Sequence, residues 1–276
     1  MNNTLENNIE VKNLCAAYDD RIIINDLNLA IPKGKITMII GANGCGKSTF
    51  LKTVARILPA KRGEIEINGM NIKKHASKEL ARQMAVLPQS PKVPNGLLVK
   101  ELVAYGRFPY QSPMGGLKQE DMKMIDWALS ATQMKEFADR PIEALSGGQR
   151  QRAWISMTLA QGTDILLLDE PTTYLDMSHQ LEILELLKKL NQDNKTTIVI
   201  VLHELNNATK FADHLIGFKA GSVVFEGKPI DVVTSENLKK LYGIDATLQL
   251  DETGSYPICV DFELWNEEEE EKAVSK

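Results

Sequence analysis

Short apolar runs alternate with amphipathic segments along much of the chain. Three runs are rich in Leu, Ile and Val, as strands buried on both faces of a sheet should be: 35–40, 164–170 and 196–204. Between the last two runs, a segment of helical periodicity places four leucines on one stripe, namely Leu181, Leu184, Leu187 and Leu190. This strand–helix–strand order predicts an α/β fold with a largely parallel sheet.

The first apolar run is also followed by an amphipathic segment. Residues 47–58 carry apolar side chains at helical spacing, and Pro59 is predicted to stop this helix after Leu58. A glycine-rich stretch separates the run from the segment. The predicted local order is therefore strand, glycine loop, helix.

The remaining patterns are of two kinds. Residues 9–18, 21–31, 63–69 and 221–227 resemble strands and predict an antiparallel sheet joined to the edge of the parallel core. Between Pro88 and Gly162 only helical patterns occur, which predicts an inserted helical subdomain. Late in the chain, residues 258–264 alternate apolar and polar side chains and predict a half-buried strand.

Composition narrows the class of protein. With 43% apolar and 25% charged residues the chain is ordinary for a soluble globular protein, and no apolar run approaches the roughly 20 residues that cross a bilayer. The formal net charge is −5, with an acidic run at 267–271, so nothing indicates a nucleic-acid partner. No secretion signal and no CxxC pair occur, so we expect a cytoplasmic location with reduced thiols.

The stretch GANGCGKST carries the first candidate chemistry. It fulfils the phosphate-loop pattern GxxxxGK[ST] between a predicted strand and a predicted helix. Its glycines let successive backbone N–H groups turn toward one anion, and the helix N-terminus adds partial positive charge. We expect Lys47 to bridge the β- and γ-phosphates and Ser48 to give its hydroxyl to Mg²⁺. The predicted nucleotide-binding residues of the loop are Gly41, Ala42, Asn43, Gly44, Cys45, Gly46, Lys47, Ser48 and Thr49.

Two acidic residues end the run 164–170. An acidic side chain at the end of a buried apolar strand is costly unless it meets a cation, so Asp169 is a candidate ligand of Mg²⁺. Glu170 comes one residue later and points elsewhere. We expect it to act as the general base that orients and deprotonates the attacking water.

The stretch LSGGQRQR, at 145–152, decides among the families with a phosphate loop. Together with GANGCGKST, LLLDEPTTYLD and VLHE it resembles the ATP-binding-cassette (ABC) transporter ATPases, from Ile9 to about Gly243. The resemblance implies a P-loop NTPase (RecA-like) core with a mainly parallel sheet, an antiparallel β-subdomain and an inserted α-helical subdomain. It also implies ATP and Mg²⁺ as cofactors and ATP hydrolysis as the activity.

We expect four parts on this basis. Residues 1–90 would be the first part of the nucleotide-binding core with the antiparallel β-subdomain, and 91–162 the inserted helical subdomain with the signature. Residues 163–245 would complete the core. Residues 246–276 would form a C-terminal extension with an acidic tail.

The family's functional residues carry over position by position. Tyr18 matches the aromatic residue that stacks on adenine, and Gln89 matches the glutamine that touches Mg²⁺ or the water and reports to the membrane subunit. His203 matches the histidine that contacts the γ-phosphate. Asp176 matches the loop that links two sites. The signature residues, which contact ATP of the opposite protomer in this family, are Ser146, Gly147, Gly148 and Gln149.

The resemblance also implies partners. The active form would be a head-to-tail homodimer at the cytoplasmic face of the cell membrane, bound to integral membrane permease subunits and served indirectly by an extracytoplasmic substrate-binding protein. The stretch VKELVAYGRFPY, at 99–110, and EPTTYLD are similar to the ATPases of importers for ferric siderophores, haem and cobalamin. Ferric siderophore import is the preferred substrate class.

Two other classes of protein are alternatives to an importer ATPase. A soluble DNA-repair or chromosome ATPase of related design would need a long coiled-coil insertion between Lys47 and Ser146, and no heptad run is present there. A non-enzymatic module or a translation-factor cassette would be favoured by a missing Glu170 or by two cassettes in one chain. The sequence shows neither feature.

Overall fold

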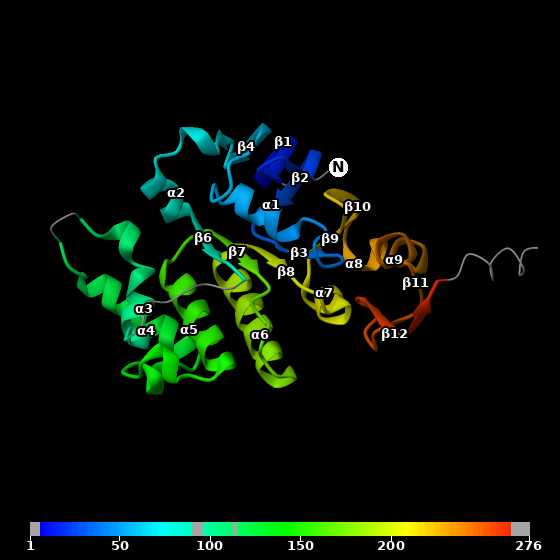
Figure 1. The fold of residues 1–276 in the computed structure, drawn as a ribbon. Coiled ribbons are helices and arrows are strands. Elements are labelled where there is room, and N and C mark those ends of the chain that lie inside the picture. The colour runs from blue at the N-terminus through cyan, green and yellow to red at the C-terminus, as the bar shows by residue number, and fades with distance from the viewer. Residues whose placement is uncertain (1–5, 90–95, 113–114, 266–276) are drawn as a thin grey trace, which may run out of the picture.

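A six-stranded sheet forms the centre of the molecule in this computed structural model, which describes residues 6–89, 96–112 and 115–265 (Figure 1). The strand order is β10-β9-β3-β8-β7-β6. All neighbours pair in parallel except β10, which runs antiparallel to β9 at one edge. The bounds are β3 Ile36–Ile40, β6 Met84–Leu87, β7 Ile165–Asp169, β8 Thr197–Val201, β9 His214–Lys219 and β10 Ser222–Gly227.

A second, antiparallel sheet lies above this one, with the first helix between them (Figure 1). Its order is β2-β1-β4-β5, and residues 221–227 are not part of it, because they form β10 of the parallel sheet. That part of the prediction was wrong: the segment pairs with β9, its neighbour in the chain. The bounds are β1 Asn7–Tyr18, β2 Arg21–Pro32, β4 Arg62–Ile67, β5 Met70–Asn71 and α1 Lys47–Val54.

Helix α1 ends one turn earlier than predicted. It stops at Val54, Arg56 takes a positive φ of 58°, and the Leu58 amide bonds back to the carbonyl of Lys52. The guanidinium of Arg56 then donates to two carbonyls of a neighbouring loop. Tertiary hydrogen bonds, rather than Pro59, therefore set the end of this helix.

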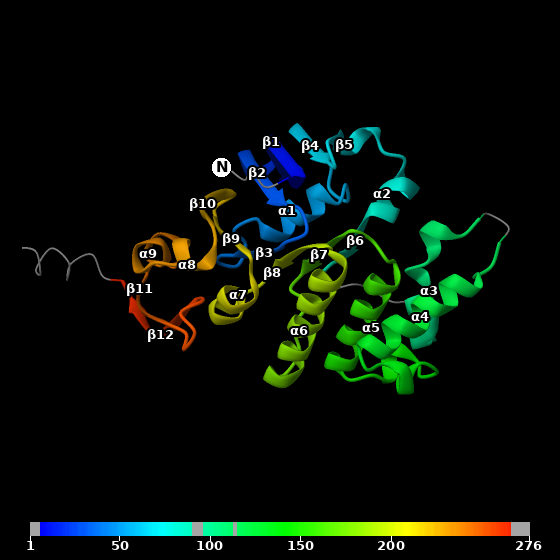
Figure 2. The ribbon, with the colours of Figure 1, turned by 180° about the vertical axis from the view of Figure 1, so that it is seen from behind.

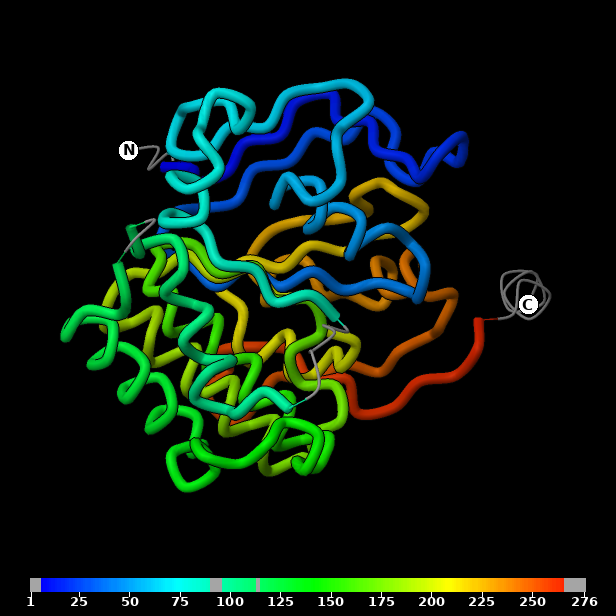
Figure 3. Tube along the Cα trace, turned by 60° about the vertical axis from the view of Figure 1, so that its left-hand side comes forward, coloured from blue at the N-terminus to red at the C-terminus, as the bar shows by residue number. Residues whose placement is uncertain are grey.

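A helical segment leaves the parallel sheet after β6 and returns to it at β7, as the tube in Figure 3 shows in green. It lies to one side of the two sheets in both ribbon views (Figures 1 and 2). In the part of this segment that is described no strand occurs, in agreement with the prediction. Its helices are α3 Val99–Tyr105, α4 Gln119–Ala131 and α5 Gly147–Ala160; α2 Ser77–Gln83 precedes β6.

The last part of the chain covers the opposite side (Figure 2). The strand predicted at 258–264 is present as β12, which pairs antiparallel with β11. The prediction that it is half-buried was wrong, because Val260, Phe262 and Leu264 are exposed on this two-stranded sheet. The acidic run 267–271 lies outside the described residues. The remaining elements are α6 Met177–Asn194, α7 Leu205–Phe211, α8 Pro229–Val232, α9 Ser235–Tyr242, β11 Ile244–Leu250 and β12 Pro257–Leu264.

Two apolar cores lie on the two faces of the parallel sheet. In β3, Met38 and Ile40 belong to the core under α5, α6 and α7, whereas Ile39 belongs to the core beneath α1 and the antiparallel sheet. This alternation explains why the strands read as continuous apolar runs. On α6 the predicted stripe is only partly buried: Leu184 and Leu187 are covered, but Leu181 is 38% exposed.

Within the described ranges, no helix combines the length and the apolar character that spanning a bilayer requires. The predicted fold class is confirmed by the mostly parallel sheet, the separate antiparallel sheet and the helical segment. The parallel strands matter most for function, because the loops after their carboxyl ends meet at one edge of the sheet.

Candidate functional site

A pocket of about 710 Å³ opens at the carboxyl ends of β3, β6, β7 and β8. Loops after parallel strands meet at this edge, which is where open α/β sheets usually bind ligands. Most of the residues predicted for nucleotide binding and hydrolysis lie together here. The lining residues are Tyr18, Arg21, Ile23, Asn43, Gly44, Cys45, Gly46, Lys47, Ser48, Thr49, Gln89, Glu170, Thr173, His203 and Glu204.

The glycines of the loop are required by backbone shape and by close packing. Gly41 has φ 149° and Gly46 has φ 112°, both in the region that residues with a side chain rarely adopt. A Cβ atom at Gly41 would lie 2.0 Å from the carbonyl oxygen of Phe218, and one at Gly46 would lie 3.1 Å from the Phe218 ring. The phosphate loop is therefore pressed against β9.

Lys47 lies folded over the loop that it follows. Its ammonium donates to the carbonyl oxygens of Gly41 at 2.7 Å and Ala42 at 3.0 Å, and the side chain is buried. The thiol of Cys45 is 3.8 Å from the same ammonium. The positive charge therefore sits at the base of the pocket, beside the backbone N–H groups of the loop.

Ser48 and Asp169 meet although they come from α1 and β7. The Ser48 hydroxyl donates to Oδ1 of Asp169 at 2.9 Å, and Asp169 is 2% exposed. Its second oxygen, Oδ2, has no hydrogen-bond partner among the described residues. Burial raises the pKa of Asp169, and the Ser48 hydrogen bond counteracts this only in part.

This pair fits a hard cation. In the described part of the chain no group of three or more His, Cys, Asp or Glu could hold a metal ion alone. Mg²⁺ does not need such a cage, because it commonly takes one or two protein oxygens and completes its shell with water and substrate phosphates. The unpartnered Oδ2 of Asp169 is the group that a cation would satisfy.

Glu170, His203 and Gln89 form a second cluster beside this pair. The Nε2 atom of His203 is 2.7 Å from Oε1 of Glu170. Burial alone would raise the pKa of Glu170, but hydrogen bonds from His203 and Gln89 outweigh it and hold the pKa below its usual value. Glu170 is therefore a carboxylate at neutral pH, and it also has a positive φ of 53°. An ionised carboxylate is the form that can accept a proton from water.

The open side of the pocket is formed by the β1–β2 turn. Tyr18 is 42% exposed there and pairs with Arg21 across the turn. Sequence reasoning identified Tyr18 but missed Arg21, Ile23, Thr173 and Glu204, which also line the pocket. The two residues of β2 could have been found from the short turn, because a tight hairpin places the start of β2 beside the end of β1.

The signature lies apart from this pocket. Ser146 caps α5: its hydroxyl accepts from the Gln149 amide at 3.2 Å, while Gln149 Oε1 accepts from the Ser146 amide at 3.0 Å. Ser146 and Gly147 are exposed. None of the four signature residues is among the described residues that line the nucleotide pocket of the same chain.

Asp176 is also outside the pocket and has a clear local role. Its Oδ1 accepts from the His179 amide at 3.0 Å and lies 2.9 Å from His179 Nδ1, so it caps α6. The hydrogen bond from the His179 amide is the main cause of the lowered pKa of Asp176. The exposed Tyr174 precedes Asp176 by two residues, and its Cβ would lie 3.6 Å from a Cβ atom at Gly147.

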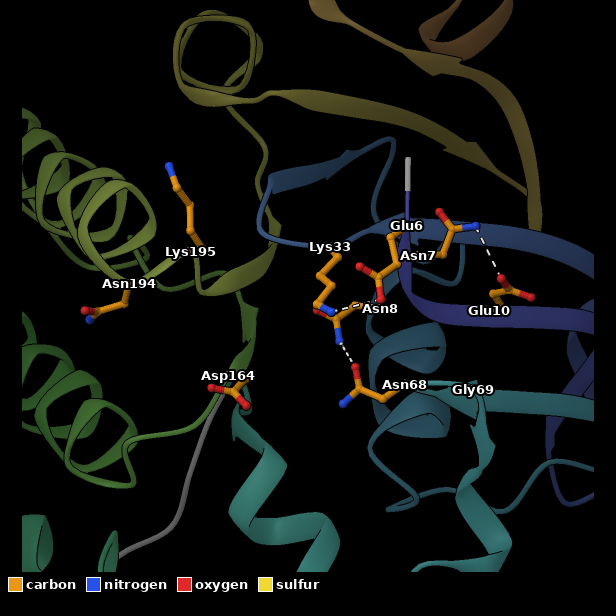
Figure 4. Close-up of a pocket in the computed structure, with 10 residues that line it drawn as sticks. All are labelled: Glu6, Asn7, Asn8, Glu10, Lys33, Asn68, Gly69, Asp164, Asn194 and Lys195. Atoms are coloured by element: carbon orange, nitrogen blue, oxygen red, sulfur yellow. Dashed lines mark hydrogen bonds and ion pairs between the residues drawn. The ribbon is translucent and has the colours of Figure 1, made fainter. Parts of the chain in front are cut away.

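A larger cavity of about 1020 Å³ lies elsewhere, near the amino ends of the parallel strands (Figure 4). Its side chains largely satisfy one another: Lys33 pairs with Glu6 at 3.0 Å, and Asn8 donates to Asn68. Asp164 comes just before β7. Because its lining precedes the strands and holds no loop glycines arranged for an anion, this cavity is not the candidate site.

Comparison with known proteins identifies the family of this chain. Residues 24–173 match the family described as ABC transporter. The chain belongs to the ABC transporter family. Among curated ABC proteins it is 52% identical over 264 residues to the iron(3+)-hydroxamate import ATP-binding protein FhuC of Bacillus subtilis, covering 96% of this chain and 98% of that protein.

Other ABC proteins agree with this assignment. The chain is 43% identical to the ferric enterobactin transport ATP-binding protein FepC of Escherichia coli, covering 90% of this chain and 91% of that protein. A solved ABC cassette, a dimeric post-hydrolysis state bound to ADP and Pi, superposes with a TM-score of 0.72 at 31% identity, covering 80% of this chain and 98% of the other. The predicted ATPase class and the resemblance to siderophore-importer ATPases are confirmed.

Proposed function

We propose that this ABC ATPase powers a membrane importer of ferric siderophores. One observation carries the proposal: the buried pair of Ser48 and Asp169, with Glu170 beside it, completes a phosphate loop in a chain 52% identical to a named iron(3+)-hydroxamate import protein. The site supports nucleotide hydrolysis, and, independently of it, the relatives' names support the cargo.

The loop residues Gly41–Thr49 bind the phosphates of ATP in this proposal. Backbone N–H groups and the ammonium of Lys47 hold the β- and γ-phosphates, and the base stacks on Tyr18. Ser48, Asp169 and Gln89 would hold Mg²⁺, and the ion would neutralise negative charge on the phosphates.

Glu170 and His203 act on the attacking water and on the γ-phosphate. The Glu170 carboxylate accepts the water proton. His203, whose Nε2 lies 2.7 Å from Oε1 of Glu170, contacts the γ-phosphate. Because Glu170 already accepts hydrogen bonds from three side chains, those of His203, Gln89 and Thr173, its orientation is fixed before the nucleotide enters. Gln89 follows β6 and links this cluster to the helical segment.

Two copies of the chain form the working unit. The signature residues 146–149 stand at the start of α5, away from their own nucleotide pocket, and Ser146 and Gly147 are exposed. A helix start with free N–H groups favours an anion, so the signature of one copy would meet the γ-phosphate held by a second copy. Asp176 lies in the loop that links the two sites. The dimeric form of the solved cassette supports this arrangement.

A mixing experiment tests the dimer. Lys47→Ala removes the phosphate ligand and Ser146→Arg blocks the signature, so each variant alone should hydrolyse ATP at under about 1% of the wild-type rate. A mixed dimer contains one site with an intact loop and an intact signature. Mixing equal amounts should restore a measurable rate, whereas a rate that stays at the level of the single variants would contradict head-to-tail pairing.

The proposed partners lie in and outside the membrane. Integral permease subunits would provide the transmembrane path, and an extracytoplasmic binding protein would deliver the cargo to them. The chain would then sit at the cytoplasmic face of the cell membrane.

The chain is proposed to divide into four parts. These are two parts of the nucleotide-binding core, 1–90 and 163–245, the helical subdomain 91–162 and the C-terminal extension 246–276.

The cargo is tested by competition in cells that lack this chain. Restoring it should recover uptake of a radioactive ferric hydroxamate, and excess unlabelled ferric hydroxamate should compete whereas haem and cobalamin should not. Recovery of haem or cobalamin uptake alone would support the alternative that the ATPase serves another cargo. Hydrolysis of ATP without recovery of any of the three would favour a non-transport ABC ATPase.

A further inference from the structure

Arg107 lies buried in the helical segment, outside the nucleotide pocket, and only 7% of its surface is exposed. Its Nε donates to Oδ1 of Asp121 at 2.9 Å, while Nη1 donates to the carbonyl oxygens of Ala160 at 2.8 Å and Gln161 at 3.0 Å. The guanidinium also stacks over the Tyr110 ring, with its central carbon 3.9 Å from the ring centroid. One side chain therefore joins α3, α4 and α5.

Two of these contacts are made at the carboxyl end of α5. The last carbonyl groups of a helix have no partner within the helix and carry partial negative charge, so a guanidinium is well suited to bind them. The other end of α5 begins at Gly147, within the signature. The helix has 14 residues and so spans about 21 Å. Arg107 and the signature therefore lie at opposite ends of the same helix, α5.

Two exposed aromatic side chains flank Arg107. Tyr105 is 54% exposed and Phe108 is 71% exposed. Between them, a Cβ atom at Gly106 would lie 2.2 Å from the carbonyl oxygen of Met157 in α5. The backbone of this segment is therefore in direct contact with α5, and a displacement of the aromatic surface cannot be absorbed at Gly106.

The partner of Arg107 is also firmly held. Asp121 is 3% exposed, and its Oδ2 accepts from the Lys118 amide at 2.9 Å at the start of α4. Burial would raise the pKa of Asp121, but the hydrogen bonds from the Lys118 amide and from Arg107 hold it below the usual value. The hydroxyl of Tyr110 donates to the carbonyl of Gly162, just beyond α5. Arg107, Asp121 and Tyr110 therefore form one charged, hydrogen-bonded cluster that fixes α4 to the carboxyl end of α5.

We infer that Arg107 is a positioning residue that ties the exposed surface formed by Tyr105 and Phe108 to the carboxyl end of α5. A membrane subunit pressing on this surface would move α5 as a rigid body and so move the signature at its far end. This inference rests on the proposed importer function. The contacts of Arg107 with described residues are to Asp121, Ala160, Gln161 and Tyr110, none of which lines the nucleotide pocket, so its loss should separate transport from hydrolysis.

The test compares the full-length chain with Arg107→Lys in membrane vesicles that contain the importer. Lysine keeps the charge but cannot make the forked hydrogen bonds or the planar stack. We expect ATP affinity of the isolated variant to stay within about twofold, whereas the amount of ferric hydroxamate imported per ATP hydrolysed falls at least fivefold. Arg140→Lys is the matched control, because exposed Arg140 stacks on Phe137 and should leave the ratio unchanged.

Two further variants keep the test decisive. Asp121→Asn removes the negative partner and should lower the same ratio, and the double variant should be no worse than Arg107→Lys alone, since both changes break the same cluster. If Arg107→Lys yields no folded protein, Tyr110→Phe and Tyr110→Leu carry the same test: phenylalanine removes only the hydroxyl bond to Gly162, and leucine also removes the ring under Arg107. Every ratio is measured well below the melting temperature of the variant.

The outcomes separate this inference from the proposed function. An unchanged ratio in a folded Arg107→Lys chain, with wild-type import intact, would overturn the positioning role alone. Absence of ferric hydroxamate import with the wild-type chain would contradict the proposed function instead. A fall in ATP affinity equal to the fall in import would show that Arg107 acts on the nucleotide site and would also overturn the inference.

Discussion

Replacing Asp169 with Asn should change stability and nucleotide binding in opposite directions. The wild-type carboxylate is 2% exposed, and its Oδ2 has no hydrogen-bond partner among the described residues. Leaving a buried polar group unsatisfied costs about 1–3 kcal/mol, and more for a charged group. Asparagine keeps the shape and the Ser48 hydrogen bond but removes the charge, while its amide still lacks one partner.

Because the asparagine amide also lacks one partner, we expect the gain in stability of Asp169→Asn to lie at the lower end of that range of about 1–3 kcal/mol, at about 1 kcal/mol. A net gain of about 1 kcal/mol in the free energy of unfolding corresponds to a rise of about 2–4 °C in the melting temperature of a protein of this size class. The gain should appear only in EDTA without nucleotide. With ATP and Mg²⁺ the order should reverse, because binding stabilises the wild-type chain and Asp169→Asn loses a cation ligand.

The pH dependence has a definite sign. Burial raises the pKa of Asp169 in the folded state, so its protonated form is favoured by folding. The wild type therefore loses stability as pH rises from the ordinary pKa of aspartate through the raised value, and the loss is complete above it. The advantage of Asp169→Asn should be full at neutral pH and should shrink as pH falls through this window.

Thermal unfolding monitored by intrinsic fluorescence measures all of these effects. Asp164→Asn is the control, because Asp164 is exposed at the opposite end of β7 and should leave the melting temperature unchanged. A melting temperature of Asp169→Asn several degrees below the wild type in EDTA would contradict the expected gain in stability. It would mean that the carboxylate stabilises the empty pocket.

Three further predictions concern the same pocket. Gly41→Ala should weaken ATP binding at least tenfold by equilibrium titration, because the added methyl group would meet the Phe218 carbonyl at 2.0 Å; Gly69→Ala, with open space around it, should leave ATP binding unchanged. Glu170→Gln should keep ATP affinity but lower phosphate release by about 10²–10⁴-fold. Alkylation of Cys45 should block ATP binding, and prior ATP should slow its modification as followed by mass spectrometry; full binding after complete modification would disprove this.

The sequence was sufficient for the main elements of the pocket. The apolar runs that became β3, β7 and β8 were recognisable because both faces of each strand are buried. The loop between β3 and α1 was recognisable because few residues besides glycine fit the backbone at Gly41 and Gly46. These features are local, and a local pattern can be read from one chain.

What could not be predicted depends on tertiary contacts. The end of α1 is set by hydrogen bonds from Arg56, and β6 and β9 were missed because each is a short run without clear alternation. The hydrogen bond between His203 and Glu170 joins residues that follow two different strands, β8 and β7. The buried role of Arg107 is equally invisible in the sequence, where arginine reads as a surface residue.

ATP hydrolysis by this chain is proposed to drive uptake of ferric siderophores. The most direct measurement is the initial rate of ferric hydroxamate uptake in cells lacking the chain, restored with wild type or Glu170→Gln at matched expression. We expect full recovery with the wild type and less than about 1% of that rate with Glu170→Gln. Equal uptake with both copies, or none with either, would contradict this role.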